Sequence, residues 1–248
     1  MPTYELTRDG IQGLNTEIAV LPVASLEQHG PHLPVNTDII IAEAYAEELS
    51  RELNAFQLPC IPISTCREHM GYKGSVWINP DTFYRVIKDI CLSLKEQGFK
   101  KVVLLQGHGG IFVAVPAIRE LNATLNPELQ VCRIDPGNYL EQFRKAGIIS
   151  SQVCLHADEF ETSLVMHLRK ELVQADLIKD CIPEVPREYL NYGSIYCATP
   201  TGVWGQPSLA SAEKGGKLLA CGSRLMAEDA RRIFNYMDKK VPQGYSRF

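Results

Sequence analysis

The sequence predicts an α/β sandwich with a largely parallel central sheet. Short apolar runs alternate along the chain with longer segments whose apolar residues recur at helical spacing. Strand–helix alternation of this kind is typical of parallel sheets. The run at residues 101–106 is also continuously apolar at its centre, as expected for a strand that is covered on both faces.

The first half of the chain shows this alternation. Residues 17–23 are mostly apolar but too few for a helix, which predicts a buried strand. Residues 37–53 carry apolar side chains at helical spacing and predict a helix. A second strand is predicted for residues 56–63, where Pro59 and Pro62 indicate a sheet edge or a strand end.

The second half continues in the same way. An amphipathic helix is predicted for residues 81–97, with Gly98 as its C-cap. The later predicted elements are the strands at 101–106 and 129–134, the helices at 113–125, 160–172 and 212–236, and a loop rich in Pro, Gly and Tyr at 181–208. Because no repeat or linker interrupts the pattern, residues 1–248 are expected to form a single domain.

The composition is that of an ordinary globular protein. Hydrophobic residues make up 45% and charged residues 22% of the 248, and the formal net charge is −4 without a basic tract, which argues against nucleic-acid binding. No apolar stretch approaches the roughly 20 residues of a membrane span, and the N-terminus does not resemble a secretory signal. The eight cysteines form no CxxC pair and are typical of buried thiols in a reducing compartment. We therefore expect a cytoplasmic protein with neither nucleic-acid nor membrane partners.

The first polar cluster follows the strand predicted at 17–23. Glu27 and His29 lie two residues apart, so that in extended backbone both side chains point to the same side, at the end of the strand where open α/β sheets bind ligands. Asp38 stands where the next helix begins, with Thr37 as a candidate N-cap. Asp38 alone could equally be a favourable charge at a helix N-terminus, but the three residues together favour a metal site.

The second cluster, Gln106-Gly-His-Gly-Gly110, follows the strand at 101–106 and presents His108 between glycines. A phosphate cradle is the minority interpretation, because no Lys-Ser/Thr and no GxGxxG accompany the glycines. The third cluster opens the helix predicted at 160–172. There Asp158 with Glu161 forms a pattern like a capping box, which leaves His156 and Glu159 to be explained otherwise.

Carboxylates and imidazoles without a thiolate suit Zn²⁺, Mn²⁺ or Fe²⁺. An aspartate that bridges two such ions would create a centre that lowers the pKa of a bound water and polarises a carbonyl, which is the chemistry of amide hydrolysis. A serine or cysteine nucleophile has less support, because no GxSxG motif occurs.

These clusters resemble the creatininase (creatinine amidohydrolase) family. The string E-x-H-G-x-H-x-P-x-x-x-D, which starts at Glu27, is specific, and the stretches 67–75 and 201–215 match further family motifs. The resemblance implies a three-layer α/β/α sandwich that is usually assembled as a hexamer. It also implies two divalent metal ions in each chain: Zn²⁺, Mn²⁺ or both, with Fe²⁺ as a further candidate.

The resemblance also implies roles for individual residues. Glu27 and His108 would hold one ion, His29 would hold the other, and Asp38 would bridge them. In creatininase the last ligand is a glutamate two residues after the histidine of the Gly-rich turn, and that position here is Gly110.

Many family members instead carry H-A-G-E-x-E-T-S, which here is the third cluster with Asp158 in place of the glycine. We therefore predict Glu159, at the position of the first glutamate, as the last ligand. Glu161 would orient a ligand. His156 matches a family histidine that moves protons near the scissile bond.

The resemblance makes creatinine itself a poor candidate substrate. Creatininase stacks its flat substrate among aromatic residues, but the corresponding positions here are Gly109 and Gln152. The predicted substrate-binding residues are His69, Ser75, Gly109 and Trp204. The residues of the 67–75 stretch could as easily belong to a surface loop.

The leading hypothesis is a metal-dependent hydrolase that cleaves a C–N bond of a small polar amide or cyclic amide. A metal-bound hydroxide would attack the carbonyl, the second ion would stabilise the oxyanion, and His156 would donate a proton to the leaving group. The alternative is a metal-assisted isomerase, lyase, epimerase or hydrolase acting on a keto-sugar or cyclitol derivative. A catalytically idle metal-binding homologue is a third interpretation, against which the complete set of candidate ligands argues.

Overall fold

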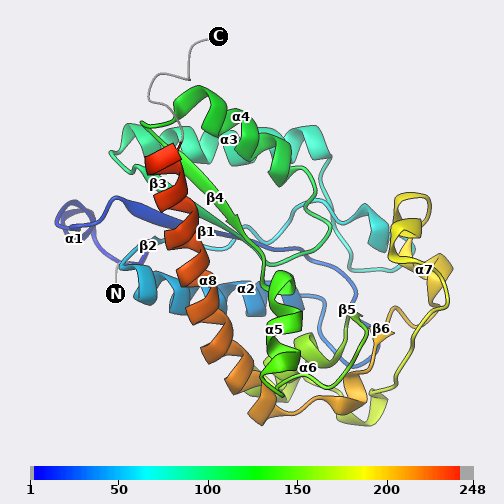
Figure 1. Cartoon of the computed structure of the whole chain (residues 1–248). Helices are drawn as coiled ribbons and strands as arrows, with labels where there is room; N and C mark the ends of the chain where they lie inside the picture. The colour runs from blue at the N-terminus through cyan, green and yellow to red at the C-terminus, as the bar shows by residue number, and fades with distance from the viewer. Residues whose placement is uncertain (1–2, 241–248) are drawn as a thin grey trace.

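The structure, a computed structural model that describes residues 3–240, confirms the predicted sandwich around a parallel sheet (Figure 1). The sheet has the strand order β2–β1–β3–β4, formed by β1 (Ile18–Val23), β2 (Phe56–Gln57), β3 (Lys101–Gln106) and β4 (Gln130–Ile134). All of its neighbouring strands are parallel, and β1 pairs with β3 along its whole length.

The predicted strand at 56–63 is mostly wrong, because β2 has only two residues. Pro59 and Pro62 have no amide hydrogen and interrupt the ladder. After Gln57, two amides of this segment still donate hydrogen bonds to β1: Leu58 to the carbonyl of Val20, and Ile61 to the carbonyl of Pro22.

Helices cover both faces of the sheet (Figure 1). Alternate residues of β1 point to opposite faces of the sheet. Leu21 packs in the core formed with α3 (Pro80–Glu96) and α4 (Ala114–Leu125). Val20 packs in the other core, formed with α2 (Thr37–Leu53) and α8 (Ala212–Lys240). The two separate cores make the fold a three-layer sandwich, as expected.

Smaller elements complete the chain. The predicted helix at 160–172 is shorter and becomes α6 (Glu159–Leu168), followed by a 3₁₀ turn at Lys170–Leu172. The predicted loop at 181–208 contains short elements. The remaining elements are α1 (Arg8–Gln12), α5 (Leu140–Lys145), α7 (Ile195–Ala198), the antiparallel pair β5 (Cys154–His156) and β6 (Trp204–Gly205), and 3₁₀ turns at Arg67–His69, Pro136–Tyr139, Ala175–Leu177, Arg187–Asn191 and Pro207–Leu209.

Thr37 is not the N-cap that the sequence suggested. Asn36 occupies the cap position of α2, and Thr37 is the first helical residue, where its hydroxyl donates to the carbonyl of Pro34 at 2.7 Å. Asp38 consequently lies in the first turn of α2.

The strand order positions a site. The chain leaves β1 for β2 on one side of it and then returns to β3 on the other side, so the order reverses at β1. In open α/β sheets, ligands bind beyond the carboxyl ends of the strands at such a reversal. Among residues 3–240, no helix has the length and apolarity needed to cross a membrane.

Candidate metal centre

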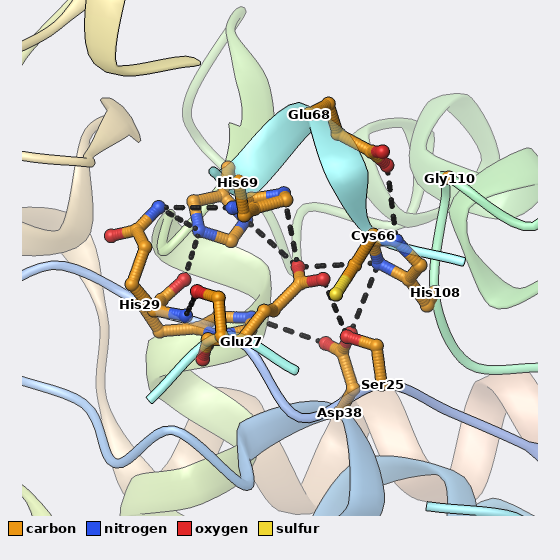
Figure 2. Close-up of polar contacts among 12 residues, drawn as sticks. Ser25, Glu27, His29, Asp38, Cys66, Glu68, His69, His108 and Gly110 are labelled. Carbon is orange, nitrogen blue, oxygen red and sulfur yellow. Dashed lines mark hydrogen bonds and ion pairs between the residues drawn. The ribbon is translucent and has the colours of Figure 1, made fainter. Parts of the chain in front are cut away.

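Two carboxylates and two imidazoles meet beyond the carboxyl ends of β1 and β3 (Figure 2). Glu27 and His29 follow β1, Asp38 comes from the start of α2, and His108 follows β3. All four side chains are buried. The structure therefore brings together four of the five residues that the sequence suggested as ligands.

The two carboxylate oxygens of Asp38 face different histidines. Oδ1 lies 3.1 Å from Nε2 of His29, and Oδ2 lies 3.2 Å from Nδ1 of His108. Ser25 donates a hydrogen bond to Oδ2 at 3.1 Å. A carboxylate in this position can bridge two cations, one on each side.

Glu27 provides a direct test of whether a cation fits. Its Oε1 atom is buried and accepts no hydrogen bond within the described chain, although Nε2 of His69 and Nδ1 of His108 lie 3.1 and 3.2 Å away. An unsatisfied buried carboxylate oxygen is costly in free energy. A cation between this oxygen and the neighbouring ligand atoms would remove that cost, so the residues present fit a metal ion.

Glu161, rather than Glu159, faces this cluster from α6. Oε2 of Glu161 lies 3.7 Å from Nε2 of His29. Two positions two residues apart on an α-helix point in nearly opposite directions, so only one of the two glutamates can face the ions. The helix starts at the predicted cap: the side chain of Asp158 accepts hydrogen bonds from the amides of Phe160 and Glu161.

The structure places Glu159 in a different, fully buried environment. Its carboxylate accepts hydrogen bonds from the amides of Ser150 and Ser151, at 3.0 and 2.6 Å, and pairs with the ammonium of Lys214. The carboxylate of Glu159 is thus already satisfied by three donors and joins none of the groups of ligand atoms described next.

Three groups of possible ligand atoms, each within 4.8 Å of one another, overlap in this centre. They are Glu27, Asp38 and His108; His29, Asp38 and Glu161; and Glu27, His29 and His156. The first two groups share Asp38, which is the arrangement that a binuclear site requires.

Hydrogen bonds fix which nitrogen of each histidine faces the cluster. Nδ1 of His29 lies 3.1 Å from the carbonyl oxygen of Glu27, which only accepts, so Nδ1 carries a proton and Nε2 faces Asp38. In the same way, Nε2 of His108 donates to the carboxylate of Glu68 at 3.1 Å, which leaves Nδ1 facing Glu27 and Asp38.

Without ions, protons compensate the buried carboxylates. Burial opposes a charge on His29, but Asp38, Glu161 and Glu27 outweigh burial and raise its pKa to about 10. The pKa of His108 is likewise raised, against burial, mainly by Glu27. The centre therefore attracts positive charge, which divalent ions would supply when bound.

His156 has the opposite electrostatics. Burial, reinforced by His29 and His69, lowers its pKa well below the usual value, so the imidazole is neutral. Its Nε2 donates to the carbonyl oxygen of Gln28 at 2.7 Å, and Nδ1 lies 3.8 Å from Oε1 of Glu27. A neutral imidazole therefore presents a free lone pair to the centre.

The predicted substrate-binding residues are only partly brought together. His69 and Gly109 line the small pocket above the centre. Ser75 does not line it: its hydroxyl accepts a hydrogen bond from the amide of Gln28 at 3.0 Å. Trp204 is buried in β6, 4% exposed, and lines neither this pocket nor the larger cavity beside it.

Glu68 is a site residue that the sequence interpretation missed. A Cβ atom on Gly110 would lie 1.6 Å from Oε1 of Glu68 and 2.4 Å from Nε2 of His108. The carboxylate of Glu68 therefore occupies the space that a side chain at position 110 would need (Figure 2). The glycine at position 110, where creatininase has a glutamate, was the only signal for it in the sequence.

A cavity of about 1120 Å³ opens beside the centre. Glu68, His108, Gly109, Glu161 and Arg187 line both this cavity and the small pocket above the candidate ligands. The centre is therefore accessible to a substrate from this side.

Comparisons with known proteins agree with this geometry. The chain is 24% identical to a 3-dehydro-scyllo-inosose hydrolase of Thermotoga maritima, over 94% of this chain and 79% of that protein. It is 24% identical to the creatinine amidohydrolase of Pseudomonas putida, over 88% of this chain and 90% of that protein. A crystal structure of creatinine amidohydrolase (creatininase) superposes with a TM-score of 0.81 at 22% identity, covering 94% of this chain and 98% of the other.

The sequence profile of the creatininase family, described as creatinine amidohydrolase, matches residues 4–229. That range includes β1, β3 and α6, and with them every candidate ligand. The chain therefore belongs to the creatininase family of hydrolases.

Proposed function

We propose that the chain hydrolyses a C–N bond of a small polar amide or cyclic amide at a centre of two divalent ions, Zn²⁺ and/or Mn²⁺, with Fe²⁺ also suited. The observation that carries the proposal is the position of Asp38, whose two carboxylate oxygens belong to two separate groups of ligand atoms. When bound, such ions lower the pKa of a coordinated water and polarise the substrate carbonyl.

The ligand assignment follows the geometry. Glu27 and His108 would hold one ion and His29 and Glu161 the other, with Asp38 between them. This assignment gives Glu161 the ligand role that the sequence interpretation gave to Glu159, because Glu159 is held by Lys214 on the other side of α6.

The proton carrier in this proposal is His156. Because its imidazole is neutral and its Nε2–H is held by the carbonyl of Gln28, Nδ1 can accept a proton from the attacking water and then deliver it to the leaving nitrogen. The side chain of Gln28 holds this arrangement. Its Oε1 accepts from the amide of Gly30 at 2.9 Å, which directs its amide nitrogen to Nδ1 of His69 at 3.1 Å.

The metal content of variants tests the proposal. Asp38→Ala is expected to lose both ions and all turnover, because it removes the bridge. The matched control is Asp81→Ala, which removes an exposed aspartate from the first turn of α3. Retention of two ions per chain in Asp38→Ala, measured by mass spectrometry after gel filtration, would contradict the bridging role.

A second candidate is hydrolysis or rearrangement of a keto-sugar or cyclitol derivative. It is supported by the similarity to the inosose hydrolase, and the same ions would stabilise an enediolate. Incubation of the metal-loaded protein with an amide panel and with a keto-sugar panel, followed by NMR, separates the two. Loss of the NMR signal of an amide carbonyl supports amide hydrolysis, and loss of the signal of a ketone carbonyl supports the reaction on a keto-sugar.

We also propose that residues 1–248 form one catalytic domain of a cytoplasmic homohexamer that acts on small molecules. The support for the hexamer and for the location is the resemblance to the family. Light scattering on the purified protein tests the assembly.

A further inference from the structure

The cavity beside the centre is larger than a minimal amide requires. Its volume of about 1120 Å³ slightly exceeds the roughly 300–1,000 Å³ that small-molecule sites usually occupy. A substrate whose scissile bond lies over the centre therefore has room for a further group in this cavity. The charges on the cavity wall indicate the chemistry of that group.

Three arginines line the cavity, and two of them are already engaged. Arg133 donates to the side-chain oxygen of Gln106 at 3.1 Å and lies 3.9 Å from Asp135. Arg67 donates to the side chain of Asn79 at 3.3 Å and lies over the ring of Trp77.

Arg187 differs from both. Within residues 3–240 its guanidinium forms no ion pair and no hydrogen bond, although at longer range its charge opposes the rise in the pKa of Asp135 that burial causes. It begins the 3₁₀ turn Arg187–Asn191, part of the yellow segment beside α7 in Figure 1. Of the three arginines, it alone also lines the small pocket above the candidate ligands.

The guanidinium of Arg187 lies beside Gly109. A Cβ atom on Gly109 would lie 3.7 Å from a terminal nitrogen of Arg187. The residue after His108 has no side chain, and the guanidinium reaches the space in front of it. An anion held there would lie close to the ions that His108 helps to bind.

Among the described residues, no carboxylate on the same walls forms an ion pair with Arg187. Asp135, which interacts with it only at longer range, accepts a hydrogen bond from the amide of Gly137 at 2.9 Å and lies 3.9 Å from Arg133. Glu68 accepts from His108, Glu161 faces His29, and Asp158 caps α6. Glu188 is exposed and lines the large cavity, but it does not line the pocket above the centre. A guanidinium without a protein partner recognises a carboxylate or a phosphate through paired hydrogen bonds.

We propose that Arg187 binds an anionic group, a carboxylate or a phosphate monoester, that the substrate carries beside its scissile amide. This inference rests on the proposed hydrolysis of amides and adds the substrate class to it. Arg187 determines specificity and takes no part in bond cleavage, so its removal acts through substrate binding.

Two matched ligand pairs test the proposal. N-acetylglycine is compared with N-acetylglycinamide, and N-acetylglucosamine 6-phosphate with N-acetylglucosamine, by calorimetry on the metal-loaded protein and by assay for released acetate. Arg187→Gln is expected to weaken binding of the preferred anion by about 10- to 100-fold, the loss typical of one charged hydrogen-bonded contact. Binding of the neutral members and the metal content are expected to stay unchanged. The pair that responds identifies the anion as carboxylate or phosphate.

Controls separate this proposal from its alternatives. Bound metal ions also attract anions. Tighter binding of the anionic ligand than of the neutral one by the unmodified protein is therefore no evidence for a role of Arg187. Arg119→Gln, at an exposed site on α4 outside the cavity, is expected to change nothing, and Arg187→Lys is expected to retain part of the affinity. Equal anion binding by Arg187→Gln and the unmodified protein would overturn the proposal. Anion binding that depends on Arg187 without any acetate release would leave it standing and count against the proposed hydrolysis.

Discussion

The carboxylate of Glu68 accepts a hydrogen bond from Nε2 of His108 at 3.1 Å, in the space that a side chain on residue 110 would need. A carboxylate behind a metal-binding imidazole fixes its orientation and makes it a stronger ligand. His108 in turn lowers the pKa of Glu68 against the effect of burial. The pair is held from two elements, the 3₁₀ turn Arg67–His69 and the loop after β3.

Loss of this carboxylate is expected to weaken metal binding. Glu68→Ala frees His108 to rotate, and the affinity for the ion it holds is expected to fall by about 10- to 100-fold. Glu68→Gln still accepts the hydrogen bond and is expected to lose less. Titration with Zn²⁺ or Mn²⁺ measures this, with Glu188→Ala as a control on the same cavity wall. Equal affinities in Glu68→Ala and the unmodified protein would show that His108 needs no such support.

The two glutamates of α6 are expected to respond differently to the same substitution. Glu161→Gln is expected to lower occupancy of the ion beside His29. Glu159→Gln leaves Lys214 without its charged partner and is expected to cost about 1–3 kcal/mol of stability at unchanged metal content. Metal analysis and urea unfolding of both variants check this. Metal loss in Glu159→Gln alone would restore the assignment drawn from the sequence.

His156 is expected to matter for turnover and little for metal binding. His156→Ala removes the proposed proton carrier, and kcat is expected to fall by about 10²- to 10⁴-fold while two ions remain bound. The measurement is steady-state turnover together with metal content of the same preparation. Full activity of His156→Ala would show that another group carries the proton.

Metal binding is expected to release protons. Without ions, the pKa of His29 is about 10 and that of His108 is well raised, so both imidazoles are protonated near pH 7.5. Burial also raises the pKa of Glu161 well above its usual value. Ions must displace the protons on these ligands, so about two to three protons should leave per chain and affinity should rise with pH up to about 10. Calorimetry in buffers of different ionisation enthalpy counts these protons. A count of zero would contradict the raised pKa values.

His32 is expected to make the protein sensitive to acid. Burial, with the nearby His29, lowers its pKa to about 4, and its Nε2 pairs with the hydroxyl of Thr162 at 3.0 Å. Because the folded pKa lies below the unfolded value, its contribution is complete above pH 6.5 and is lost as the pH falls from 6.5 through about 4, at most about 3 kcal/mol. His32→Gln cannot titrate and should flatten that decline in urea unfolding of the metal-free protein. Parallel pH curves for the two proteins would exclude His32 as the cause.

The sequence predicted the layers of the fold and much of the candidate centre. Apolar periodicity located α2 at its observed bounds and β1 to within one residue, because strand and helix periods differ clearly over such lengths. Glu27 and His29 were recognisable because their spacing alone puts them on one side of an extended chain. The proximity of His108 followed from its place after a second parallel strand.

The missed features depend on contacts between distant segments. The choice between Glu161 and Glu159 depends on the direction from which α6 approaches the sheet, and no local pattern carries that direction. Lys214 lies 55 residues after Glu159 and holds it away from the candidate ligands. Glu68 and Arg187 reach the site from loops whose paths no periodicity describes.

Gly215 lets α8 approach α6 so closely that a Cβ there would lie 2.0 Å from the carbonyl oxygen of Ser163. The position of Glu161 therefore depends on α8, a helix that begins about 50 residues later in the chain. A chain truncated before residue 212 would keep Glu27, His29, Asp38 and His108 but lose the helix against which α6 packs. Such a truncation is consequently expected to disturb the side of the centre formed by Glu161 more than the side formed by Glu27 and His108.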